Sequence, residues 1–175
     1  IPECININNE VVGKIGPVIA GQYTAFYWKD DGVTSTVDMI NLGYLDQGVR
    51  SIANGINDSG QIVGVSSLTA SDHFSNIHAC MWDENHNISD LGTLGGVKST
   101  ANSINNSSQV VGFSILSDGI TQHAFVWDST NNMQDLNDLI LPGSGWELTE
   151  ATDINSSGQI VGCGTINGET HAFIL

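Results

Sequence analysis

Three histidines lie at equivalent places in this 175-residue chain and are the first candidates for chemistry. His78, His123 and His171 are each followed by alanine and then by phenylalanine or cysteine. Neutral imidazole is a common metal ligand. One histidine per repeated unit, however, leaves the three side chains on separate parts of the fold, with no reason to converge. We therefore interpret them as structural residues and predict no metal site.

A short run of acidic and amide residues, 153–158 (Asp-Ile-Asn-Ser-Ser-Gly), is similar to the start of a calcium-binding loop. It lacks the closing acidic ligand that such a loop uses. The position of Asp153 is taken by Cys4, Gly55 or Ser103 in the other copies, so the charge is not repeated. Turn formation explains the run better than cation binding does.

Catalysis has no recognisable motif in the sequence. There is no nucleophile elbow, no pair of histidines at metal-binding spacing and no phosphate-binding loop. We predict no catalytic residue, no cofactor and no enzymatic activity. Acidic and histidine side chains from several units still provide groups that can assemble into a site. A carbohydrate-active hydrolase on the same scaffold therefore stays the alternative.

Internal repetition is the dominant feature of the chain. A nine-residue block of the type Ile-Asn-x-x-x-Gln-Ile-Val-Gly begins at residues 5, 56, 104 and 154, so successive copies are 51, 48 and 50 residues apart. A second block, close to His-Ala-Phe-x-Trp, begins at residues 24, 78, 123 and 171. A third block, close to Asp-Leu-Gly, ends the first three units. The constant order of the blocks indicates a repeat architecture.

The first block predicts a β-hairpin. Isoleucine and asparagine are followed by three turn residues and then by Gln-Ile-Val-Gly. The third turn position is Gly60 or Gly158 in two copies, where a left-handed backbone costs no Cβ clash. Asn9 takes this position in the first copy, and asparagine is the next most tolerant residue. Ser108 takes it in the third copy, where we expect backbone strain.

Each unit thus holds about four short strands: one on each side of the turn, the His-Ala-Phe strand and the Asp-Leu strand. Four antiparallel strands repeated every 40–50 residues or so are typical of a β-propeller blade. We predict an all-β fold, a β-propeller-like array of four-stranded antiparallel units, three complete and one partial. The array forms a single repeat domain over residues 1–175, with units at approximately 1–50, 51–98, 99–148 and 149–175. A β-trefoil stops at three units and fits badly.

The charge of the chain excludes one class of partner. Four basic residues against nineteen acidic ones give a formal net charge of −15. This charge repels phosphate backbones and anionic membrane surfaces, so we predict no nucleic-acid partner. No stretch approaches the roughly 18 apolar residues that a bilayer-spanning helix needs. We therefore predict no membrane insertion.

The repeated blocks resemble the HAF-repeat family of extracellular bacterial proteins, which is named for the His-Ala-Phe triplet. The resemblance covers nearly the whole chain. The sequence departs from the pattern at Thr24, Cys80 and Leu175, where His, Phe and Trp otherwise stand. The resemblance implies an extracellular or cell-surface location and supplies no established catalytic residues. It also implies that the repeat region ends at or near Leu175.

Two irregular insertions are the candidate binding sites. Residues 66–77 lengthen the second unit, and residues 141–147 break the pattern of the others. Propellers present long connections at the ends of the ring, and such loops commonly bind ligands. The ligand-binding candidates are Asp72, His73 and Trp146. We predict a secreted, non-enzymatic module that binds a protein or a glycan through its loop faces.

The three cysteines, Cys4, Cys80 and Cys163, are too few for a disulfide framework. Closure of the array into a ring would bring its first and last units together and allow a Cys4–Cys163 bridge. Cys80 would then act as a small hydrophobic residue in the phenylalanine position. Against the bridge, Cys4 and Cys163 belong to different strands of the unit, and a disulfide needs Cα atoms within about 7 Å.

The last unit stops in its His-Ala-Phe strand and lacks an Asp-Leu strand. Propellers commonly complete the last blade with a strand from the N-terminus, but no Asp-Leu-Gly sequence precedes Ile5. We expect a longer precursor to supply residues before Ile1. Without them, the last unit should have three strands and an exposed edge, which favours self-association by pairing with another chain.

Overall fold

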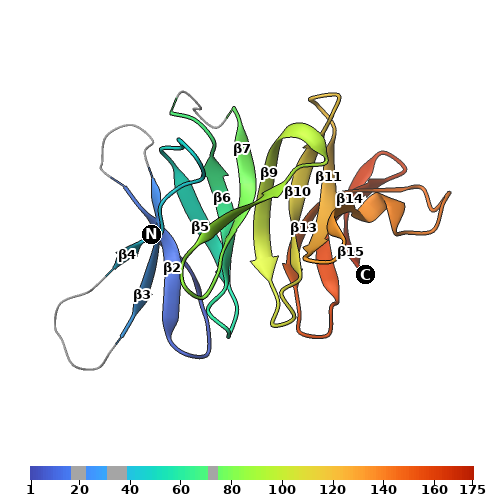
Figure 1. The fold of residues 1–175 in the computed structure, drawn as a ribbon. Helices are drawn as coiled ribbons and strands as arrows, with labels where there is room; N and C mark the ends of the chain where they lie inside the picture. The colour runs from blue at the N-terminus through green and yellow to red at the C-terminus, as the bar shows by residue number, and fades with distance from the viewer. Residues whose placement is uncertain (17–22, 31–38, 71–74) are drawn as a thin grey trace.

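The protein is built from β-strands (Figure 1). The structure is a computed structural model that describes residues 1–16, 23–30, 39–70 and 75–175. These residues form fifteen strands, one short 3₁₀ turn, η1 (Leu136–Asp138), and no α-helix. The prediction of an all-β fold with antiparallel sheets is confirmed. No helix long and apolar enough to cross a membrane occurs in the described ranges.

The first unit is an antiparallel sheet in which chain order equals spatial order, β1-β2-β3-β4. Its strands are β1 (Pro2–Ile5), β2 (Glu10–Ile15), β3 (Thr24–Lys29) and β4 (Ile40–Asn41). The first two strands form the predicted hairpin, in which Ile5 pairs with Val11. The third strand carries the block that aligns with His-Ala-Phe.

The second and third units join into one eight-stranded sheet. The second unit consists of β5 (Ser51–Ile56), β6 (Ile62–Ser67), β7 (Ile77–Trp82) and β8 (Ile88–Gly92). The third unit consists of β9 (Gly95–Ile104), β10 (Val110–Leu116), β11 (Gln122–Asp128) and β12 (Asn132–Asp135). A parallel pair between Ile77 and Lys98 joins β7 to β9. The expected separation into four-stranded units is thus only partial, because the long strand β9 runs beside β7 at its start.

The last sheet has three strands in the order β13-β14-β15. They are β13 (Trp146–Ile154), β14 (Ile160–Ile166) and β15 (Glu169–Ile174). Within the described part of the chain, no strand pairs with the outer edge of β15. The strands β9 and β13 begin a few residues before the approximate unit boundaries at 99 and 149.

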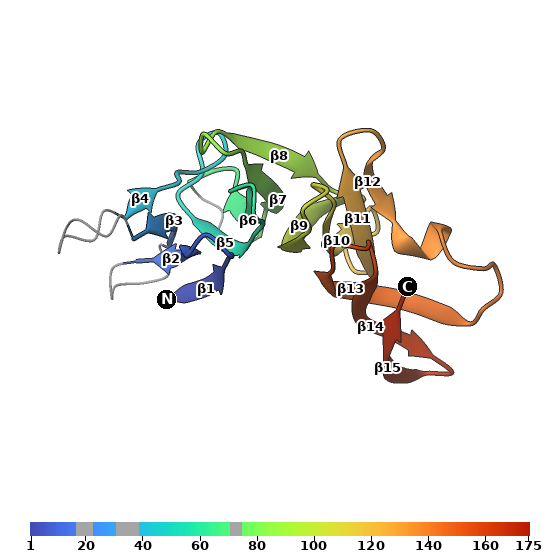
Figure 2. The same ribbon diagram turned by 90° about the horizontal axis from the view of Figure 1, so that it is seen from below.

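The first and last sheets lie at opposite ends of an open array (Figures 1 and 2). Cys4 lies in β1 and Cys163 in β14, and all three cysteines are free. The Cys4–Cys163 bridge that ring closure would allow is not formed, because the array does not bring its first and last sheets together. Cys80 is fully buried in the phenylalanine position, and this burial raises the pKa of its thiol.

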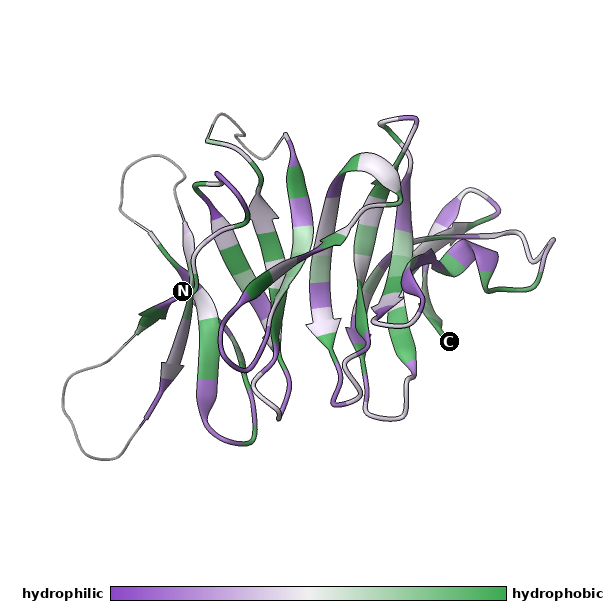
Figure 3. Ribbon diagram, viewed as in Figure 1, coloured by the Kyte–Doolittle hydropathy of each residue, from purple (hydrophilic) through white to green (hydrophobic). Residues whose placement is uncertain are grey.

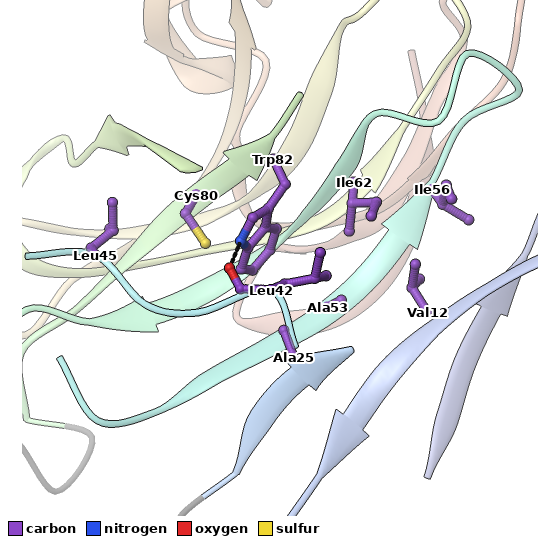
Figure 4. Close-up of a cluster of buried hydrophobic side chains, with 9 residues drawn as sticks. All are labelled: Val12, Ala25, Leu42, Leu45, Ala53, Ile56, Ile62, Cys80 and Trp82. Atoms are coloured by element: carbon purple, nitrogen blue, oxygen red, sulfur yellow. Dashed lines mark hydrogen bonds between the residues drawn. The ribbon is translucent and has the colours of Figure 1, made fainter. Parts of the chain in front are cut away.

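Hydrophobic residues recur along the strands (Figure 3). The side chains of successive units pack together, so each core is shared by two units. In the first core, Val12, Ala25 and Leu42 of one unit meet Ala53, Ile62 and Trp82 of the next (Figure 4). The indole N–H of Trp82 donates to the carbonyl of Leu42 at 2.7 Å. The second core contains Val63, Ala79, Leu91, Ala101, Ile104, Val110 and Phe125. The third contains Val111, Ala124, Leu136, Leu148, Ala151, Ile154, Ile160 and Phe173.

One asparagine in each hairpin closes its own turn and links successive units. The Asn57 Oδ1 atom accepts from the backbone N–H groups of Ser59 and Gln61. Its Nδ2 group donates to Gln61 Oε1 at 2.7 Å and to the backbone carbonyl of Asn105, in the next hairpin, at 3.1 Å. The same link joins Asn6 to Asn57 at 2.9 Å, and Asn105 to Asn155 at 3.1 Å. We call Asn6, Asn57, Asn105 and Asn155 the asparagine ladder.

Ser108 adopts the left-handed conformation expected of its turn position, with a φ of 60°. The equivalent residues Asn9, Gly60 and Gly158 also have positive φ values. The Ser108 hydroxyl donates to Gln61 Oε1, in the preceding unit, at 2.7 Å. This hydrogen bond between units offsets part of the cost of a left-handed residue with a Cβ atom.

Candidate functional site

The structure describes one of the three ligand-binding candidates. Asp72 and His73 lie outside the described residues. Trp146 is the first residue of β13 and is half-buried. Its ring meets the imidazole of His171 edge-on, with the ring centroids 6.3 Å apart. Trp146 thus lies where the connection from η1 enters the last sheet.

Trp146 lines an apolar hollow of about 550 Å³ beside the last strand, which we call the β15 groove. On one side is the connection between η1 and β13, which carries the exposed side chains of Leu139 and Leu141. On the other side is β15, with Phe173 and Ile174. Among the described residues, none that lines the groove has a charged side chain. An apolar, aromatic-lined hollow with few polar groups is typical of a binding site.

Some backbone N–H and C=O groups of β15 point away from the neighbouring strand β14, toward the outer edge of the sheet. Leu175 and Ile160 exchange two backbone hydrogen bonds, with N···O distances of 2.9 and 3.0 Å. Because hydrogen-bonding direction alternates along an antiparallel strand, the N–H and C=O groups of Ala172 and Ile174 point outward. The β15 groove is therefore bordered by an open strand edge.

The first three units show what occupies the same edge elsewhere in the molecule. In the first unit the Leu42 N–H donates to the carbonyl of Ala25, the counterpart of Ala172, at 2.9 Å. The Leu42 side chain is buried, and so are its counterparts Leu91 and Leu136. In the last unit, the described residues supply neither this backbone partner nor this leucine. The β15 groove lies at the place of a fourth strand.

Two of the repeated histidines hold the fourth strand of their own unit. The distance from His78 Nδ1 to Asp90 Oδ2 is 2.8 Å, and that from His123 Nδ1 to Asp135 Oδ2 is 2.5 Å. Burial raises the pKa of the Asp90 carboxyl, but hydrogen bonds from His78 and from the Gly92 N–H outweigh this effect, so the pKa lies below its ordinary value. The histidine thus ties the His-Ala-Phe strand to the Asp-Leu strand.

His171 differs from these two histidines because its unit has no Asp-Leu strand. Its side chain is about half exposed, and the nearest described carboxylate oxygen, Glu169 Oε2, is 3.7 Å from Nε2. Sequence reasoning missed the histidine–aspartate pairs, although a constant separation of 12 residues marks them. In the described ranges, no group of three or more His, Cys, Asp or Glu residues is placed to hold a metal ion. The interpretation that these histidines do not bind metal stays a prediction.

Comparison with known proteins supports the fold. No protein-family model and no curated protein matches the chain. Among solved structures, TolB from Acinetobacter baumannii, a β-propeller-like protein, is similar over 99% of the chain, with a TM-score of 0.59 and 12% sequence identity. The chain spans 39% of the length of that TolB chain. At this identity, the similarity concerns the fold alone.

Proposed function

We propose that the chain is a non-enzymatic protein-binding module that accepts an extended segment of a partner as an added strand against β15. The observation that carries this proposal is the β15 groove, in which an open strand edge borders an apolar hollow. Strand addition is a recurring mode of peptide recognition, in which backbone hydrogen bonds give affinity and side-chain pockets give specificity.

The proposal treats the molecule as a β-propeller-like array with three complete four-stranded units and one partial unit. The four-residue ladder of asparagines and the similarity to TolB support this arrangement. The partner segment then plays the part that β4, β8 and β12 play in the other units. Each of these strands pairs with the His-Ala-Phe strand of its unit in an antiparallel manner.

The internal counterparts of the added strand define the sequence it should have. In the second unit, Asp90 pairs with His78 and Leu91 is buried in the core. In the last unit, His171 is available to an aspartate, and the β15 groove is available to a leucine. The partner segment should therefore be extended and contain Asp-Leu. This is a protein ligand rather than a glycan.

We also propose that the chain is secreted or displayed at the cell surface, so that its partner is an extracellular protein. The resemblance of the repeated blocks to HAF-repeat proteins supports this location. The test is to detect the protein with a specific antibody in the culture medium, the cell-surface fraction and the lysate of its source organism. Recovery from the cytoplasmic fraction alone would contradict the proposed location.

The binding proposal is tested with a fluorescein-labelled peptide, Asn-Ile-Ser-Asp-Leu-Gly-Thr, which copies residues 87–93 of this chain. Fluorescence anisotropy should show saturable binding, and a peptide with lysine in place of leucine should not bind. The Ile174→Pro substitution removes an outward N–H without removing a hydrogen bond to β14. It should weaken peptide binding at least about tenfold, whereas Ile120→Pro, in an exposed turn, should not.

Three outcomes would overturn the proposal. The first is a failure of the peptide to bind, and the second is binding that Ile174→Pro leaves unchanged. The third is turnover of a polysaccharide that disappears when one aspartate or histidine is changed, which would favour the carbohydrate-active hydrolase. Circular dichroism of each variant separates a lost binding site from a lost fold.

A further inference from the structure

The last unit exposes residues that the other units bury. Val161 is 39% exposed, whereas its counterparts in the first three units, Val12, Val63 and Val111, are fully buried. Ala172 is exposed, whereas its counterparts Ala25, Ala79 and Ala124 are fully buried. In each of the first three units, the equivalent valine and alanine are covered by the following unit. We call Val161, Ala172 and Asn155 the trailing face.

The first unit exposes the complementary half of the same interface. Ile5 is 60% exposed, whereas its counterparts, Ile56, Ile104 and Ile154, are buried at 5–7% exposure. Pro2 is exposed, whereas its counterparts, Ala53, Ala101 and Ala151, are fully buried. A hollow of about 620 Å³ lies over this surface, between Pro2, Ile5 and Val11. We call these three residues the leading face.

Within the described residues, the asparagine ladder ends at each face with a hydrogen-bonding group that is not used between units. In the described part of the chain, Asn155 Nδ2 donates to Gln159 Oε1, but it has no acceptor in a following hairpin. At the other end, the Asn6 carbonyl accepts from the Asn9 N–H, but not from an asparagine of a preceding hairpin. Asn155 is exposed, whereas Asn57 and Asn105 are buried. The donor at one end thus corresponds to the acceptor at the other.

We infer that a second copy of this chain docks head to tail, with its leading face on the trailing face of the first. The contact continues the three interfaces that already exist within the chain. Valine and alanine of the trailing face meet proline and isoleucine of the leading face, and Asn155 donates to the Asn6 carbonyl of the second copy. The interface is heterologous, so repeated docking produces closed rings or open chains of copies.

Charge makes the association dependent on salt. Each copy carries a formal net charge of −15, so two copies repel each other over long distances. Added salt screens charges that are separated by more than about 10 Å at 0.1 M ionic strength, whereas apolar contact is retained. Head-to-tail association should therefore strengthen as the salt concentration rises, in contrast to an interface formed by salt bridges.

The test uses two variants that each damage one face. Ile5→Lys breaks the leading face and Val161→Lys breaks the trailing face, and both substitutions reduce the net negative charge. Sedimentation velocity over a wide range of protein concentration should show association of the parent chain. Each variant alone should associate at least about tenfold more weakly. An equimolar mixture of the two should form a heterodimer, because it retains one intact leading face and one intact trailing face.

The matched control is Ile120→Lys, since Ile120 is 86% exposed and belongs to neither face. It should associate as the parent does. A parent chain that stays monomeric at high salt would overturn the inference, as would a mixture that fails to form heterodimers. Association that both single variants retain would also overturn it. Ala172 belongs to both the trailing face and the β15 groove, but Ile5 and Val161 do not line the groove. Ile5→Lys and Val161→Lys therefore test the docking of a second copy, whereas Ile174→Pro tests peptide binding.

Discussion

The third and fourth units have similar sequences but different surroundings. Both contain a hairpin asparagine, a Val-Val-Gly or Ile-Val-Gly strand and a His-Ala-Phe strand. Val111 is fully buried in the third unit, and Val161 is exposed in the fourth. Burial in this protein is thus determined by the following unit rather than by a residue's own sheet. A unit of this kind does not bury its hydrophobic face alone, as is general for repeat proteins.

The largest difference between the two units is expected when the same charged residue replaces the equivalent valine in each. Val111→Lys buries an unpaired ammonium group and should lower the free energy of unfolding by about 3 kcal/mol or more. Val161→Lys leaves the charge in water and should lower it by less than about 0.5 kcal/mol. Urea unfolding followed by tryptophan fluorescence at low protein concentration measures both. Equal losses would show that each unit has a core of its own.

The ladder provides a second comparison, with a smaller expected effect. Asn105→Asp removes the donor that reaches Gln109 Oε1 at 2.9 Å and the Asn155 carbonyl at 3.1 Å, at a residue that is 4% exposed. We expect a loss of about 2–3 kcal/mol in unfolding free energy, because an acceptor replaces a buried donor. Asn155→Asp, at an exposed position, should cost less than about 1 kcal/mol. Thermal unfolding of the two variants tests the difference, and a larger effect at Asn155 would contradict it.

A third comparison concerns pH. Hydrogen bonds from His78 and from the Gly92 N–H lower the pKa of Asp90 in the folded protein, so the stability that they give is present above the ordinary carboxyl pKa and is lost as the pH falls through the folded-state pKa. Asp90→Asn should therefore reduce stability at neutral pH and have little effect in strong acid. Since the Asp90 side chain is 40% exposed, solvent screening limits the loss to about 1 kcal/mol.

The control for this pH profile is His171→Gln in the last unit, where no carboxylate of the described residues pairs with His171 as closely as Asp90 pairs with His78. Urea unfolding of this variant should follow the profile of the parent chain in acid. If Asp90→Asn and the parent differ by the same amount at every pH, the histidine–aspartate pair does not contribute through its charge.

The smallest expected effect separates strain from hydrogen bonding at Ser108. Ser108→Ala keeps the Cβ atom in a left-handed residue but removes the bond to Gln61, so it should cost about 1 kcal/mol. Ser108→Gly removes both the bond and the strain, so its unfolding free energy should lie within about 0.5 kcal/mol of the parent. If Ser108→Gly is no more stable than Ser108→Ala, the turn is not strained.

The repeated blocks predicted the strands well because each block carries its own local physics. The hairpins around Asn57 and Asn155 have Gly60 and Gly158 at the left-handed turn position, and the strands flanking them pair as the predicted hairpins require. The left-handed Ser108 was predicted from its alignment with Gly60 and Gly158 alone. Local rules therefore specify the strand content and the turns.

Features that depend on how units meet could not be predicted in the same way. The parallel pair between Ile77 and Lys98 arises from the extra length of β9, which no block marks. The β15 groove is lined by leucines of a connection, including Leu139 and Leu141, that has no counterpart in other units. Trp146 was singled out by its irregular position, but its neighbours come from strands distant in sequence. Whether Cys4 and Cys163 are bridged also depended on how the units meet, because the bridge requires a closed ring.

The asparagine ladder cannot by itself select the correct neighbour of each unit during folding. Each asparagine side chain donates to the backbone carbonyl of the equivalent asparagine in the next hairpin. A hairpin that packed against a later unit instead of its neighbour would form the same hydrogen bonds. The ladder therefore carries no information about which copy is the right neighbour. Between the second and third units, only Thr93 and Leu94 connect β8 to β9. This short connection, rather than the asparagine ladder, limits misassembly at the centre of the array.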